Sequence, residues 1–155
     1  MNKKRINKDL LFVLTAGAVC FGFMSFVTVV FPAVKMLGME VSGVHAVFGG
    51  KITNGKEYSL ECKFNFLSLI GYLLPLIASV CGVIFFNSKK PLTHYVLCGL
   101  CVIGAIVIFL EPVLFSSVNE LDGSLEISLL AGPVIGGLLA IVAGGFNISC
   151  GTMKR

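Results

Sequence analysis

The sequence contains no tryptophan, and charged residues make up only 13% of it, whereas 56% of its residues are hydrophobic. Soluble proteins carry roughly 25% charged residues. A water-soluble domain of 155 residues with the composition of this chain would therefore have too little polar surface. We therefore expect lipid to be the solvent for much of the chain, which forms one membrane domain over residues 1–155. Without tryptophan, anchoring at the membrane surface falls to the phenylalanines and to Tyr58, Tyr72 and Tyr95.

Paired cysteines are missing from the segments expected outside the membrane. The six cysteines lie in or beside apolar segments, except for Cys62, so a structural disulfide is not expected. Cys98 and Cys101 form a CxxC pair, which four-helix membrane oxidoreductases also use. Those enzymes need the pair near the outer face and further loop cysteines, so thiol redox chemistry is the weakest functional hypothesis.

Motifs for catalysis, nucleotides or metals are also missing. No Ser-His-Asp set, phosphate loop or dinucleotide fingerprint occurs. The two histidines, His45 and His94, are expected on opposite sides of the membrane and cannot share a metal. We therefore expect a non-enzymatic protein without a cofactor. Its basic residues are expected to contact lipid headgroups, and nucleic acid is not an expected partner.

What the sequence does contain is a set of long apolar segments. A helix needs about 20 apolar residues to cross a bilayer, and residues 10–31, 66–86, 92–110 and 127–148 meet this length without a central charge. They predict an all-α membrane protein, a four-transmembrane-helix bundle. The first segment is longer than the apolar run of roughly 7–15 residues in a signal peptide, so we expect it to be retained.

The basic residues predict the orientation. Most of them flank the predicted spans on one side, which is then the cytoplasm: Lys3, Lys4, Arg5, Lys8, Lys89, Lys90, Lys154 and Arg155. Both termini are therefore expected in the cytoplasm, and residues 33–65 form the larger outer loop. A short, very apolar chain with a lysine-rich start is expected in the plasma (cytoplasmic) membrane of a bacterium.

The outer loop at residues 33–65 predicts a β-hairpin. Residues 58–64 alternate strictly between apolar and polar side chains, and Asn54-Gly55 precedes them. Upstream of this turn, one set of alternate positions shares a parity: Val44, Ala46, Phe48, Gly50 and Ile52. A three-residue turn over residues 53–55 keeps one apolar face intact. It sets Phe48 opposite Leu60, Ala46 opposite Cys62 and Val44 opposite Phe64, with Tyr58 lying over Gly50.

A two-stranded hairpin is only marginally stable alone, so its apolar face must rest on the helix ends, on the second outer loop or on a partner. We therefore interpret Val44, Phe48, Tyr58 and Leu60 as candidate partner-binding residues. The partner would be another membrane or envelope protein or a second copy of the chain, in addition to membrane lipids.

Small residues mark candidate helix contacts. Gly132, Gly136, Ala140 and Gly144 recur every four residues, and Ala18 and Gly22 form a shorter notch. Such stripes let two helices approach closely. Packing inside the monomer's own bundle is favoured over homo-oligomerisation, because short loops already hold the helices together.

Glu111 is the candidate transport residue. It lies nearest to the membrane among the acidic residues of the second outer loop. A solvated carboxylate at a helix end is the favoured interpretation, and a cation-attracting residue of a transporter or channel subunit is the alternative. Our first functional hypothesis remains a non-enzymatic accessory or scaffold subunit of a membrane complex.

The predicted layout resembles that of claudin-type tetraspan proteins, with four helices, inner termini and a longer, β-prone first outer loop. That family's first loop has a tryptophan motif and two disulfide-bonded cysteines. Here the loop has no tryptophan and only Cys62, so no functional residue is carried over from the family.

Overall fold

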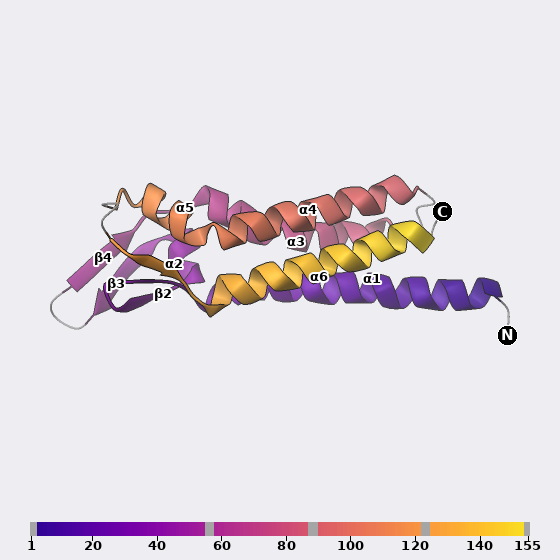
Figure 1. Ribbon diagram of the computed structural model, residues 1–155, viewed down its shortest axis with the longest axis horizontal. Coiled ribbons are helices and arrows are strands. Elements are labelled where there is room, and N and C mark those ends of the chain that lie inside the picture. Colours follow the sequence, from indigo (N-terminus) through magenta and orange to yellow (C-terminus); the bar gives the residue numbers. More distant parts are fainter. Residues whose placement is uncertain (1–2, 55–57, 87–89, 122–124, 154–155) are drawn as a thin grey trace.

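The computed structural model describes residues 3–54, 58–86, 90–121 and 125–153. It is mostly helical, and four helices are long and apolar enough to cross a membrane (Figure 1). These are α1 (Lys3–Val27), α3 (Phe66–Ile84), α4 (Pro91–Phe109) and α6 (Ala131–Met153). Each packs mainly against two others, so that the order around the bundle is α1, α3, α4, α6.

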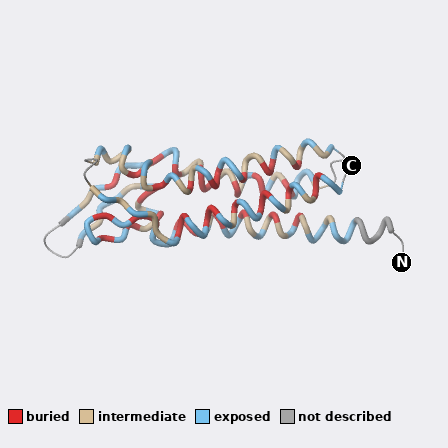
Figure 2. Tube along the Cα trace, in the orientation of Figure 1, coloured by how far each residue is buried: buried red, intermediate tan, exposed pale blue. Residues whose placement is uncertain are grey.

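The bundle buries its small and polar residues and exposes large apolar ones. Buried positions follow the inner faces of the helices (Figure 2). Buried hydroxyl and amide groups mostly donate to a carbonyl one turn back in their own helix, as Thr15 does to Leu11 at 2.9 Å and Asn147 to Ala143 at 3.1 Å. The groups bonded in this way add no unpaired donors to the interior.

One end of the bundle carries all the β-structure, and both termini lie at the other end (Figure 1). We call the β-bearing part the cap. Its elements are η1 (Thr28–Val30), β1 (Pro32–Met36), β2 (Met39–Ser42), α2 (Gly43–Phe48), β3 (Gly50–Asn54), β4 (Tyr58–Cys62), α5 (Glu111–Val118) and β5 (Ile127–Leu129). The five strands form an antiparallel sheet in the order β2-β1-β5 and a separate antiparallel pair, β3-β4.

The cap has a small hydrophobic core of its own. Val34 and Val41 of the three-stranded sheet, Cys62 of β4 and Phe115 of α5 are buried together in it. Ile52 and Leu60 of the β3-β4 pair pack against this cluster. The apolar face of the hairpin therefore rests on the chain's own second sheet and on α5, which answers a question that the sequence left open.

The predicted fourth span begins too early. Residues 127–129 form strand β5, in which Leu129 pairs with Val34 of β1, and the helix begins only at Ala131. Apolar composition placed residues 127–129 in the helix, but strand β1 pairs with them instead. Helix α4 ends at Phe109, near the end of the third predicted span, and the chain continues as the short helix α5.

The predicted first hairpin strand is wrong over residues 43–48, which form helix α2. Ser42 caps this helix by accepting a hydrogen bond from the His45 N–H at 3.4 Å, and Gly49, with φ of +78°, ends it. The apparent alternation in this segment has a helical origin. Val44 and Phe48 lie four residues apart on the exposed face, while Ala46 faces inward.

The predicted register is wrong for the same reason. Leu60 pairs with Ile52 instead of Phe48, and Cys62 pairs with Gly50 instead of Ala46. Tyr58 lies opposite Asn54 and not over Gly50. The predicted turn at residues 53–55 includes Thr53 and Asn54, which belong to β3, while residue 55 lies outside the described residues.

Candidate functional site

Helix α5 joins the cap to the bundle and places Glu111 at their boundary. It follows α4 almost without a break, because the Leu114 N–H donates to the Leu110 carbonyl at 3.0 Å. Its buried residues, Glu111 and Phe115, are four positions apart and share one face. Phe115 enters the cap core, and Glu111, one turn earlier, faces the top of the bundle.

Glu111 is fully buried (0% exposed), so it is not the solvated helix-end carboxylate that the sequence favoured. Ser68 and Tyr72 of α3 are buried and interact with the Glu111 carboxyl group, and Asn65 is buried at the N-terminus of the same helix. We call the four residues the junction cluster: Asn65, Ser68, Tyr72 and Glu111. Ser68 and Tyr72 lie one turn apart on α3. Asn65 caps α3 by accepting the Ser68 N–H at 3.2 Å.

The junction cluster contains several unpaired polar atoms. Within the described part of the chain, neither Glu111 oxygen has a hydrogen-bond partner, nor have Ser68 Oγ, Tyr72 Oη and Asn65 Nδ2. Buried polar groups are nearly always paired, and an unpaired buried carboxylate costs more than a neutral group. A cluster of this kind is typical of sites that exchange protons, ions or polar ligands.

Burial raises the pKa of the Glu111 carboxyl to about 7, and the nearby Ser68 hydroxyl opposes this by lowering it. The Ser68–Glu111 contact does not reach hydrogen-bond geometry, so burial dominates. The ionised form is the one that burial destabilises. Stability is therefore lost as the pH rises from the ordinary carboxyl pKa of 4.5 through the raised value.

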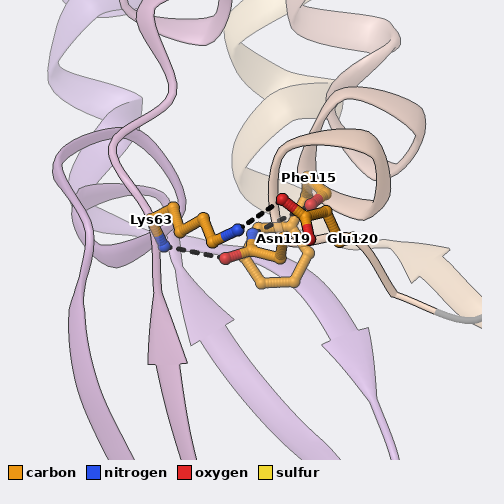
Figure 3. A network of polar contacts seen from close by, with 4 residues as sticks. All are labelled: Lys63, Phe115, Asn119 and Glu120. Atoms are coloured by element: carbon orange, nitrogen blue, oxygen red, sulfur yellow. Dashed lines mark hydrogen bonds and ion pairs between the residues drawn. The ribbon is translucent and has the colours of Figure 1, made fainter.

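A polar network ties the hairpin to the far end of α5 (Figure 3). The Lys63 N–H donates to Asn119 Oδ1 at 2.7 Å, and Lys63 Nζ pairs with Glu120 at 2.7 Å. Asn119 in turn donates to the Phe115 carbonyl at 2.8 Å. Since Asn119 holds both the hairpin and the helix end, the network helps to fix α5, and with it Glu111, over the bundle.

The predicted partner-binding residues do not share one face. Val44 and Phe48 are exposed on α2, whereas Leu60 packs inward against the cap core. Tyr58 belongs to β4, but its side chain lies outside the described part of the structure. Helix α2 bridges the tops of two bundle helices, because the Gly43 N–H donates to Phe31 and Val47 accepts from Asn65. Its exposed apolar face therefore lies level with the helix ends.

The predicted helix-packing residues all lie against other parts of the same chain or are buried in it. A Cβ at Gly132 would lie 2.8 Å from the Pro32 carbonyl oxygen, and one at Gly144 would lie 3.4 Å from Cys101 Cβ. Gly136 faces Thr28, and Ala140 is fully buried. In the notch on α1, Ala18 is buried and Gly22 lies against Pro75 and Ser79 of α3.

A groove between α1 and α3 is an apolar cavity on the bundle surface. It has a volume of about 420 Å³ and is lined mainly by α1, including Thr15, Ala16 and Cys20. Phe12 and Phe86 meet edge to face with ring centroids 6.4 Å apart. Small side chains on α1 leave this groove open toward the space that lipid would occupy.

Asn65, Ser68 and Tyr72 were not among the site residues expected from the sequence. Tyr72 was expected to anchor the chain at the membrane surface, but it is 1% exposed and packs against Val29, Val47 and Ile108. The available signal was the spacing of residues 65, 68 and 72, which puts three polar side chains on one face of an apolar helix start.

The cysteines and histidines form no recognisable centre. Cys98 and Cys101 are buried free thiols in α4, and Cys62 is a buried free thiol in the cap. In the described ranges, no three His, Cys, Asp or Glu residues gather as metal ligands. Compared with known proteins, the chain matches no protein-family model, no curated protein and no solved structure.

Proposed function

We propose that this chain is a non-enzymatic accessory or scaffold subunit that associates with another protein in the plasma membrane of a bacterium. Both termini lie in the cytoplasm and the cap lies outside. The orientation rests on the clustering of lysine and arginine beside the termini and near Lys90. The start of α1, the start of α4 and the end of α6 lie at the end of the bundle opposite the cap (Figure 1).

The observation that carries the association proposal is the uncovered face of α1. In the most apolar 18-residue segment of α1, only 22% of the residues are buried, whereas 39–44% are buried in the same segments of the other three helices. Ala16 and Cys20 are exposed one turn apart and border the groove between α1 and α3. A transmembrane helix of the partner is the occupant that fits, because small residues permit the close backbone approach that stabilises helix pairs in lipid.

Photo-cross-linking tests the α1 face directly. A photoreactive amino acid replaces Ala16 in the full-length protein in its native membrane, and the matched control replaces Val96, which is exposed on α4. We expect a discrete adduct from position 16 and none from position 96. An adduct of twice the chain's mass would identify the partner as a second copy. Identical products from both positions would contradict the proposal.

A reporter fusion tests the orientation. A fluorescent protein that folds only in the cytoplasm is expected to fluoresce when fused after the C-terminus. The same reporter inserted at the exposed β1-β2 turn, beside Gly38, is expected to stay dark. The reverse pattern would overturn the proposed topology.

A second candidate function is a cation transporter or channel subunit, and the buried Glu111 favours it. Protein reconstituted in liposomes is expected to carry a cation flux that Glu111→Gln abolishes. Flux no greater than that of empty liposomes, for wild type and variant alike, would exclude this function.

A further inference from the structure

The junction cluster differs from the other polar groups inside the molecule. Several other buried hydroxyl and amide groups of the helices donate to a backbone carbonyl, as Ser79 does to Pro75 at 2.8 Å and Ser25 does to Gly136 at 2.7 Å. A carboxylate has no proton to donate and needs N–H or O–H donors instead. The backbone N–H groups inside helices are already paired, so Glu111 cannot be satisfied in the same way.

Protonation of Glu111 removes the need of its carboxylate for hydrogen-bond donors. When a proton adds to one Glu111 oxygen, the side chain becomes neutral and gains an O–H donor. Tyr72 Oη is a buried hydroxyl oxygen that can accept from it, and it lacks another partner among the described residues. When the acid ionises, the proton returns to water and the unpaired negative charge remains buried.

No described cation neutralises Glu111. The ion pair in the described residues is the one between Lys63 and Glu120, at the far end of α5. The titratable groups on the elements around Glu111 are otherwise accounted for. Tyr72 faces Glu111, His45 bonds Ser42, Cys62 packs in the cap core, and Lys35, Lys63, Glu120 and Glu126 are exposed.

The donor set also argues against a metal cation. Sodium or calcium would need oxygen lone pairs on most sides. In the junction cluster, the Asn65 oxygen already accepts the Ser68 N–H, and the unpaired atom of that side chain is the Nδ2 donor. The Asn65 oxygen is therefore not free to serve as a metal ligand.

We propose that the junction cluster is a reversible proton-binding site in which Glu111 takes up the proton and Ser68 and Tyr72 position its carboxyl group. The site lies where α5 passes from the cap to the bundle, so proton release would place a charge beneath the cap. The proposal goes beyond both functions above, because equilibrium proton binding requires neither a partner nor ion flux.

Infrared spectroscopy of the full-length protein in phosphatidylcholine liposomes tests the site. The carbonyl stretch of a protonated carboxylic acid is followed between pH 5 and pH 9, a range chosen around the raised pKa of about 7. We expect a band that disappears with a midpoint near this value. The band should be absent from Glu111→Gln and retained in Glu120→Gln, whose carboxyl is exposed.

The direction in which Ser68→Ala moves the titration midpoint of Glu111 is a second test. Because the Ser68 hydroxyl favours the ionised form, its removal is expected to move the midpoint to higher pH. A purely structural role for Ser68 would leave the midpoint unchanged. This variant keeps the carboxyl, so it tests the site even if Glu111→Gln fails to fold.

Three results would overturn the proposal. The first is a wild-type protein without the protonated band at pH 5, and the second is a band that survives in well-folded Glu111→Gln. The third is a midpoint that falls when sodium chloride replaces choline chloride, which would assign the site to alkali cations. Absent flux in liposomes would exclude the transport function and leave the proton site standing.

Discussion

The contact between α3 and α4 allows a quantitative test with two glycines of the same helix. A Cβ on Gly104 would lie 2.7 Å from Pro75 Cδ and 2.9 Å from the Gly71 carbonyl oxygen. A Cβ on Gly99 would meet nothing within 4 Å. Gly104→Ala therefore forces α3 and α4 apart, whereas Gly99→Ala fills open space.

The expected difference follows from these distances. Overpacking a close contact costs about 1–3 kcal/mol. Both variants gain the same helix-propensity term, about 1 kcal/mol for alanine over glycine, so it cancels in the comparison. Gly104→Ala should therefore be less stable than Gly99→Ala by about 1–3 kcal/mol.

Unfolding by sodium dodecyl sulfate in mixed micelles, followed by circular dichroism, measures both free energies of unfolding. Wild type provides the reference for each variant. Equal stability of the two variants, within about 0.5 kcal/mol, would refute the reasoning that Gly104 is required for the close approach of α3 to α4.

Three further predictions concern the cap. Phe115→Ala should remove about 3–5 kcal/mol from the cap core and speed hydrogen exchange in β1 and β4 but not in the bundle; unchanged exchange in those strands would argue against a shared core. Burial raises the pKa of the Cys62 thiol, so maleimide should label it slowly in the native protein and quickly in sodium dodecyl sulfate; equal rates would contradict its burial. Lys63 lowers the pKa of the exposed Glu120 carboxyl, so Lys63→Gln should raise that pKa, as measured by NMR, with no measurable loss of stability at neutral pH. Any contribution of this pair is present at neutral pH and is lost as the pH falls through the lowered pKa of Glu120.

The bundle could be predicted from the sequence because the length of an apolar segment is a local property. Of the cap, the pairing of β3 with β4 was predicted in outline, but the other short elements could not be, since they depend on neighbours far away in the chain. Strand β5 exists because Val34 and Met36 of β1 pair with residues 127–129. Helix α2 depends on a cap at Ser42 and a left-handed Gly49, which outweigh the alternation of Val44 and Phe48.

The small-residue stripe on α6 shows what a sequence pattern can predict and what it cannot. Its spacing predicts close helix contacts, but one stripe can serve two neighbours. Gly132 and Gly136 lie against the end of α1 and the residues that follow it, whereas Gly144 lies against Cys98 and Cys101 of α4. The pattern therefore indicates that α6 is a central packing helix and says nothing of how many copies of the chain assemble.

The burial of Glu111 could not be predicted from the sequence, because the cap and the bundle produce it jointly. A carboxylate just after an apolar helix normally reaches water. Here α5 continues the helix, Phe115 holds α5 in the cap core, and Asn119 fixes its far end to the hairpin at Lys63. Loss of the cap contacts would expose Glu111 to water and return its pKa toward that of an ordinary carboxyl. By linkage, ionisation of Glu111 must weaken those same contacts. Proton binding to Glu111 and the packing of the cap on the bundle therefore stabilise each other.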